Sequence, residues 1–148
     1  MEFSPQRIAD KAPLKEPIRI LVIDDDCSIG NAIRNILGRW QCESVLVSRA
    51  HVGIEVLRQS AFDTVMVDIF MPGMNGLDAI DRIRRSSAIP IIAMSGFRRR
   101  SSPHADDYLE MAAQRGATLC MRKPFQPIQL IEAIKWSSGL ARQTPRSR

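Results

Sequence analysis

The sequence has few cysteines, few aromatic residues and no long apolar run. Its three cysteines, Cys27, Cys42 and Cys120, are odd in number and lack C-x-x-C spacing, so neither a disulfide framework nor a zinc site is indicated. No stretch approaches the roughly 20 apolar residues that a membrane span needs. Prolines and charged residues interrupt the first twenty positions, where a signal peptide would be apolar. We therefore expect a cytoplasmic protein with reduced thiols and no membrane association.

What is present fits one globular domain. The 148 residues, 45% hydrophobic and 25% charged, suffice for one core but not for two ordinary domains. A formal charge of +5 raises nucleic acid as a partner, yet residues 18–136 hold 15 basic and 13 acidic residues, and residues 137–148 add three arginines. We expect a domain over 18–136 between a flexible tail at 1–17 and a basic flexible tail at 137–148, without direct binding of nucleic acid.

Five short apolar runs alternate with five helical patterns. The runs, rich in branched residues as strands buried on both faces are, cover residues 18–23, 44–47, 64–67, 89–94 and 118–121. Apolar residues at helical spacing follow each run. In the first helix they extend from Ile29 to Trp40, with Ser28 available as N-cap. This alternation predicts an α/β fold in which helices cover both faces of a five-stranded parallel sheet.

The last two helices have recognisable starts. Ser102 and Pro103 form a good N-cap and first-turn pair for the fourth helix, which directs Tyr108 inward and stops at Gly116. The fifth helix follows Pro127 and is predicted to bury Ile128, Ile131 and Ile134.

Polar side chains follow the predicted strands at the edge of the sheet where ligands of such folds bind. They are Asp24, Asp25 and Asp26 after the first strand, Asp68 after the third, Ser95 after the fourth and Lys123 after the fifth. Neighbouring carboxylates repel one another unless a cation is present, and oxygen ligands of this kind suit Mg²⁺. Together with an amine and a hydroxyl, they form a set suited to phosphoryl transfer, in which one carboxylate could be the nucleophile.

Four segments resemble the signature blocks of the receiver domain of two-component response regulators. They are ILVIDDD at 20–26, VMVDIFMPGMNG at 65–76, IPIIAMSG at 89–96 and RKPF at 122–125. The resemblance covers about residues 18–136 and implies a flavodoxin-like, doubly wound sheet with strand order 2-1-3-4-5. It also implies a cis peptide between Lys123 and Pro124.

The resemblance implies a role for each matching residue. Asp68 would accept a phosphoryl group from a histidine kinase or a histidine phosphotransfer protein. Asp25, Asp68 and the backbone carbonyl of Phe70 would ligate Mg²⁺ directly, and Asp24 through water. Ser95 would be the switch hydroxyl and Lys123 would pair with a phosphoryl oxygen. A downstream protein partner would bind the face formed by the fourth helix and the fifth strand.

Three features depart from common choices in that family. Cys120 stands where an aromatic switch residue is expected, so coupling requires another route. Phe70 and Phe97 are bulky and apolar at positions that flank the phosphoryl group, and we hypothesise that they restrict the attacking water and slow dephosphorylation. The segment 96–102 is about six residues longer than usual and contains Arg98, Arg99 and Arg100, either a solvated loop or a partner-docking loop.

The leading interpretation is a stand-alone response regulator that switches protein contacts or relays its phosphoryl group, without a separate catalytic domain. One alternative is a Mg²⁺-dependent phosphohydrolase of haloacid-dehalogenase type, with Asp24 as nucleophile and Asp26 as acid. It leaves Asp68 and its M-P-G-M-N-G context unexplained. Another alternative is a binding module that acts without phosphorylation.

Overall fold

The computed structural model describes residues 16–96 and 105–143 and contains a five-stranded parallel sheet in the order β2-β1-β3-β4-β5. The strands are β1 (Ile18–Ile23), β2 (Cys42–Val47), β3 (Thr64–Asp68), β4 (Ile91–Ser95) and β5 (Leu119–Arg122). The helices that alternate with them are α1 (Cys27–Gly38), α2 (Ala50–Gln59), α3 (Gly76–Ser86), α4 (Ala105–Gln114) and α5 (Pro127–Gln143). The predicted fold class and strand order are confirmed.

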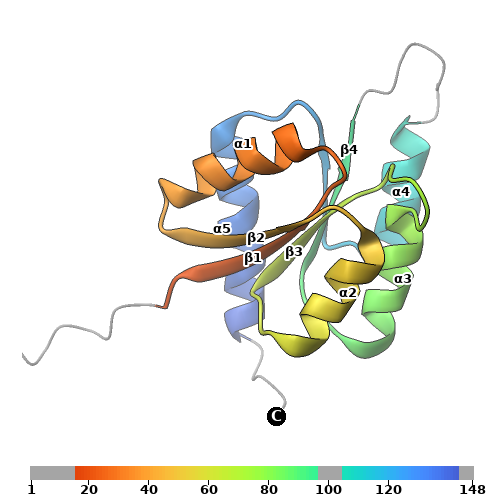
Figure 1. Cartoon of the computed structure of the whole chain (residues 1–148), viewed down its shortest axis with the longest axis horizontal. Coiled ribbons are helices and arrows are strands. Elements are labelled where there is room, and N and C mark those ends of the chain that lie inside the picture. Colours follow the sequence, from red (N-terminus) through yellow and green to blue (C-terminus); the bar gives the residue numbers. More distant parts are fainter. Residues whose placement is uncertain (1–15, 97–104, 144–148) are drawn as a thin grey trace, which may run out of the picture.

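The helices cover the sheet in two layers, with α1 and α5 on one face and α2, α3 and α4 on the other (Figure 1). The central strands β3 and β4 are buried along their whole length. The edge strands β2 and β5 are only partly buried, because each has a neighbouring strand on one side alone. The prediction that all five strands are buried on both faces is therefore wrong at the two edges.

The strand register brings the polar strand ends to one edge of the sheet. Ile23 of β1 pairs with Val67 of β3, so the next residues, Asp24 directly after β1 and Asp68 at the end of β3, lie side by side. In the same way Ser95, the last residue of β4, pairs with Arg122, and Lys123 follows directly. Parallel pairing thus gathers these residues from the ends of β1, β3, β4 and β5 at one edge of the sheet.

The ends of α1 differ from the prediction. Asp26, not Ser28, is the N-cap, because its carboxylate accepts the backbone N–H groups of Ser28 at 2.9 Å and Ile29 at 3.3 Å. The helix ends at Gly38, before Trp40, whose side chain is 48% exposed and carries the Lys135 ammonium over its ring at 4.9 Å.

Helix α5 also departs from the prediction. Ile128 is 54% exposed in its first turn, whereas Ile131 and Ile134 are buried as predicted. The helix continues to Gln143, with Ser137 and Ser138 fully buried, so residues 137–143 are not part of a tail. Ser138 packs against the start of β3, where its hydroxyl is 3.4 Å from that of Thr64. The predicted start of the fourth helix at Ser102 and Pro103 lies outside the described residues.

Candidate phosphoryl-transfer site

Three carboxylates meet where β1 and β3 end. Asp24 and Asp68 are each 5% exposed, and Asp25, which follows Asp24, is half-buried. One oxygen from each of the three lies within 4.8 Å of the others. Asp24 also accepts the backbone N–H of Asp26 at 2.9 Å, which fixes its orientation. Such an oxygen-rich cluster fits a hard divalent cation such as Mg²⁺.

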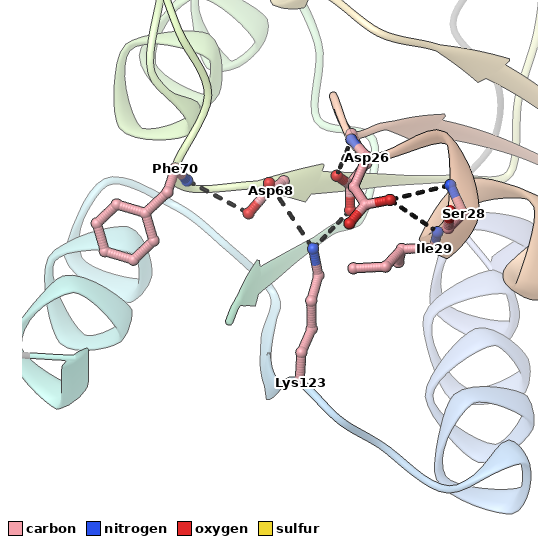
Figure 2. Close-up of polar contacts among 7 residues, drawn as sticks. Asp26, Ser28, Ile29, Asp68, Phe70 and Lys123 are labelled. Carbon is pink, nitrogen blue, oxygen red and sulfur yellow. Dashed lines mark hydrogen bonds and ion pairs between the residues drawn. The ribbon is translucent and has the colours of Figure 1, made fainter. Parts of the chain in front are cut away.

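Lys123 reaches this cluster from the end of β5 (Figure 2). Its Nζ lies 2.6 Å from Asp24 Oδ2 and 3.7 Å from Asp68 Oδ2. Its side chain is only 11% exposed, so the two ion pairs are partly shielded from water. The Lys123–Pro124 peptide is cis, as the family resemblance implies.

Burial raises the pKa of Asp68 from its ordinary value of 3.8 to about 7. The Lys123 ammonium opposes this rise, and the negative charge of Asp24 adds to it. The backbone N–H of Phe70 lowers the pKa of Asp68, and Asp25 raises it by a smaller amount. One ammonium therefore does not balance three carboxylates, and a bound cation would favour the ionised form of Asp68.

The connection between β3 and α3 holds the Asp68 backbone in place. Phe70 donates its N–H to Asp68 Oδ1 at 3.3 Å, and Gly76 donates its N–H to the Ile69 carbonyl at 2.8 Å. A Cβ atom on Gly76 would collide with the backbone carbonyl of Asp68. Asn75 caps α3 by accepting the N–H of Asp78 at 2.9 Å. The motif containing Gly76 was recognised in the sequence, but its steric requirement is visible only in the structure.

Ser95 lies at the same edge, at the end of β4, and is 3% exposed. Its carbonyl accepts the backbone N–H of Lys123 at 2.7 Å. A backbone hydrogen bond therefore joins Ser95, the predicted switch hydroxyl, to Lys123, the residue predicted to pair with a phosphoryl oxygen.

An open cavity of ≈ 790 Å³ borders the site. Its polar wall includes Asp25, Asp68 and Lys123, and its apolar wall consists of side chains from α1 and the segment after β5: Ile29, Ala32, Ile33, Ile36, Pro124 and Phe125. A smaller cavity of ≈ 260 Å³ lies beside the β3–α3 connection and is also lined by Asp25 and Phe70. The sequence pattern assigned the α1 residues to the core, but Ala32 is exposed.

Of the residues that depart from the family pattern, the structure describes Phe70 and Cys120 but not those of the segment after Gly96. Phe70 lines both cavities, and Figure 2 shows its ring pointing away from Asp68. Phe97, Arg98, Arg99 and Arg100 lie outside the described residues.

Cys120 is half-buried on β5, and its thiol donates to the Leu109 carbonyl of α4 at 3.3 Å. Burial raises the pKa of this thiol, so the neutral form that donates this bond is favoured. Tyr108, the residue before Leu109, packs against the Phe70 ring. The sequence predicted that Tyr108 is buried, but no pattern linked it to Phe70.

The geometry bears on the phosphohydrolase alternative. Asp24 Oδ2 is bound by Lys123 and Asp24 Oδ1 by the Asp26 N–H, whereas Asp26 caps α1 from an exposed position. In this arrangement Asp24 and Asp26 therefore both have hydrogen-bond partners within the protein, and neither is positioned as a free nucleophile or acid.

The helices in the described part of the chain are all too short or too polar to cross a membrane.

Comparison with known proteins identifies related sequences. Residues 20–135 match the family described as response regulator receiver domain. A relative is the DNA-binding response regulator MtrA of Mycobacterium tuberculosis, 27% identical over 117 residues, which are 79% of this chain and 49% of MtrA. The protein-glutamate methylesterase/protein-glutamine glutaminase 1 of Anaeromyxobacter dehalogenans is 32% identical over 106 residues, 72% of this chain and 29% of the enzyme. The chain spans about half the length of MtrA and less of the esterase.

Solved structures have the same fold. A CheY-like receiver domain protein from Methanospirillum hungatei has a TM-score of 0.74 at 23% identity, covering 86% of this chain and 98% of that one. NtrX from Brucella abortus has a TM-score of 0.76 at 23% identity, covering 86% of this chain and 28% of that one. The family match over residues 20–135, together with the strand order and the clustered strand-end residues, leads to one conclusion: this chain belongs to the response regulator receiver domain family.

Proposed function

We propose that Asp68 accepts a phosphoryl group from a phosphohistidine of a histidine kinase or a histidine phosphotransfer protein. The observation that carries this proposal is the position of Lys123, whose ammonium lies between the buried carboxylates of Asp24 and Asp68 at the edge of a large cavity. A cation held there can attract a phosphoryl group and neutralise charge that develops during its transfer.

In the proposed reaction a carboxylate oxygen of Asp68 attacks the phosphorus of the donor. An O–P bond forms while the N–P bond to the donor imidazole breaks, and the imidazole leaves with the electron pair of that bond and takes up a proton. Lys123 stabilises the oxygens of the transferred group, and the hydroxyl of Ser95 is proposed to donate to one of them. The product is an acyl phosphate on Asp68.

Mg²⁺ is the proposed cofactor, held by Asp25, Asp68 and the carbonyl of Phe70, with Asp24 acting through water. When bound, it supplies positive charge that neutralises the carboxylates and the phosphoryl oxygens. The three clustered carboxylates and the raised pKa of Asp68 support this assignment.

The cavity beside Asp68 offers a docking surface for the phosphodonor. Its wall on α1 is apolar and includes Ile29, Ala32 and Ile36, and Pro124 and Phe125 also line the cavity. An amphipathic helix that carries the phosphohistidine could bury its apolar side there and present the imidazole to Asp68.

We propose that the signal leaves through protein contacts at the face of α4 and β5. The names of the MtrA relatives describe DNA-binding regulators, but the match covers only 49% of MtrA. Protein contact is the proposal supported by the charge distribution of residues 18–136, which are nearly neutral.

The test is phosphorylation with acetyl phosphate and Mg²⁺, followed by intact-mass measurement of the wild type and Asp68→Asn. The proposal predicts one added phosphoryl group on the wild type and none on Asp68→Asn. Absence of the group from the wild type would favour a binding module that acts without phosphorylation. Turnover of phosphate esters that is lost in Asp24→Asn and kept in Asp68→Asn would favour the phosphohydrolase.

A further inference from the structure

Two aromatic side chains connect the Asp68 loop with α4. Phe70 follows β3, and Tyr108 lies on α4; their ring centroids are 4.9 Å apart at an interplanar angle of 76°. Both rings are half-buried and pack against the same hydrophobic cluster. An edge-to-face pair has a preferred geometry, so displacement of one ring favours movement of the other.

Phe70 is coupled to the proposed phosphorylation site through its backbone. Its N–H donates to Asp68 Oδ1 at 3.3 Å, and the intervening Ile69 is buried. A phosphoryl group on Asp68 would change the charge and the acceptor capacity of the carboxyl oxygens that this N–H contacts. The backbone of Phe70 would therefore have a different preferred position before and after phosphorylation, and its ring would follow.

Helix α4 makes described polar contacts with both α3 and β5. Near its C-terminus, Arg115 binds Asp81 of α3 at 2.7 Å and approaches Asp78 at 3.7 Å. Near Tyr108, the described polar link to β5 is the bond from the Cys120 thiol to the Leu109 carbonyl, and a thiol is a weak donor. Arg115 thus attaches the C-terminal end of α4 to α3, whereas the Leu109 carbonyl is bound to β5 through a weak donor.

We propose that the Phe70–Tyr108 pair transmits phosphorylation of Asp68 to α4. This inference rests on the proposed function and specifies how that site is coupled to the output face. Phosphorylation shifts the balance between two positions of the Phe70 ring, and each position favours one placement of the Tyr108 end of α4. The small side chain of Cys120, which binds the Leu109 carbonyl through a weak thiol donor, is compatible with such a shift.

The single tyrosine of the sequence makes this coupling directly measurable. Protein labelled with 3-fluorotyrosine reports on Tyr108 alone by fluorine NMR, and intact mass gives the phosphorylated fraction of the same sample. Acetyl phosphate with Mg²⁺ is added to the wild type, Asp68→Asn, Phe70→Leu and Phe70→Trp. Phe62→Leu is the matched control, since Phe62 is half-buried in the same cluster but packs against Arg19.

The proposal predicts a displaced Tyr108 resonance in the phosphorylated wild type and in Phe62→Leu. At equal phosphorylated fraction, Phe70→Leu loses most of that displacement and Phe70→Trp retains it, while Asp68→Asn shows none. A wild type that gains a phosphoryl group without displacement of the resonance would overturn this inference and leave the proposed function standing. Full displacement in Phe70→Leu would also overturn it. If the wild type gains no phosphoryl group, the proposed function and this inference both fail.

Discussion

The ammonium of Lys123 lies 2.6 Å from Asp24 and joins the end of β5 to the end of β1. The two residues are far apart in the sequence, and both side chains are nearly buried. The same ammonium is 3.7 Å from Asp68, so one cation partly compensates two buried carboxylates. The stability of the protein and its proposed chemistry therefore depend on the same group.

Replacing Lys123 with methionine leaves that carboxylate pair uncompensated. In the absence of divalent metal we expect the free energy of unfolding to fall by about 3–5 kcal/mol, because removing one partner of a buried ion pair leaves an uncompensated buried charge. Urea denaturation measures the change. Lys135→Met is the control, since Lys135 is exposed over the Trp40 ring and should cost no more than about 1 kcal/mol. Equal effects of the two substitutions would contradict this interpretation.

The stability of the metal-free protein should fall as pH rises. The folded-state pKa of Asp68, about 7, lies above its ordinary value of 3.8, so the folded protein binds this proton more tightly than the unfolded chain does. The stabilisation is complete below the ordinary pKa and is lost as pH rises through the folded-state pKa. Asp68→Asn lacks this proton and should lack this contribution.

The measurement is the difference in unfolding free energy between wild type and Asp68→Asn, with a chelator present. From about pH 5 to about pH 8 we expect the wild type to lose on the order of a few kcal/mol relative to the variant. Adding Mg²⁺ should restore stability to the wild type more at the higher pH, because a cation binds the ionised carboxylates. A difference that stays constant with pH would refute the assigned pKa shift.

Gly76→Ala tests the contact between the start of α3 and Asp68. The added Cβ would collide with the Asp68 carbonyl and the Ile69 backbone, so we expect a loss of about 1–3 kcal/mol through overpacking. Gly38→Ala is a matched control, because no atom lies within 4 Å of a Cβ at that helical position. Thermal unfolding of both variants distinguishes the two environments; comparable losses would show that the contact at Gly76 is not restrictive.

The hypothesis that Phe70 slows dephosphorylation remains a prediction. Phe70 lines the cavity next to Asp68, although its ring packs on Tyr108. Replacement by asparagine would admit and orient water, so we expect a shorter half-life of the phosphorylated protein, measured by intact mass after removal of the phosphodonor. A half-life in the wild type no longer than that in Phe70→Asn would reject the hypothesis.

Most of the fold and of the candidate site could be predicted from the sequence, because both follow from short patterns of neighbouring residues. Asp24 and Lys123 follow strands, Asp68 and Ser95 end strands, and parallel topology alone brings such positions to one edge. The failures concern features set by neighbouring elements. Ile128 and Trp40 fit a helical pattern, but periodicity does not reveal which turns lack a covering element or where α1 ends.

Contacts between distant elements were the hardest to predict. Asp26 caps α1 because of the backbone angles after β1, whereas the sequence pattern predicted that Ser28, two residues later, is the N-cap. The Phe70–Tyr108 pair joins a loop to a helix, and each residue had its own local explanation in the sequence. The buried serines that extend α5 beyond residue 136 are polar, so a pattern based on apolar residues ended too early.

The phosphoryl acceptor can be located chemically. Wild-type protein is treated with acetyl phosphate and Mg²⁺, and borohydride then reduces any aspartyl phosphate to homoserine, which peptide mass mapping assigns to one residue. We expect homoserine at position 68 and aspartate at position 24. Homoserine at position 24, or at neither position in protein that has gained a phosphoryl group, would contradict this expectation.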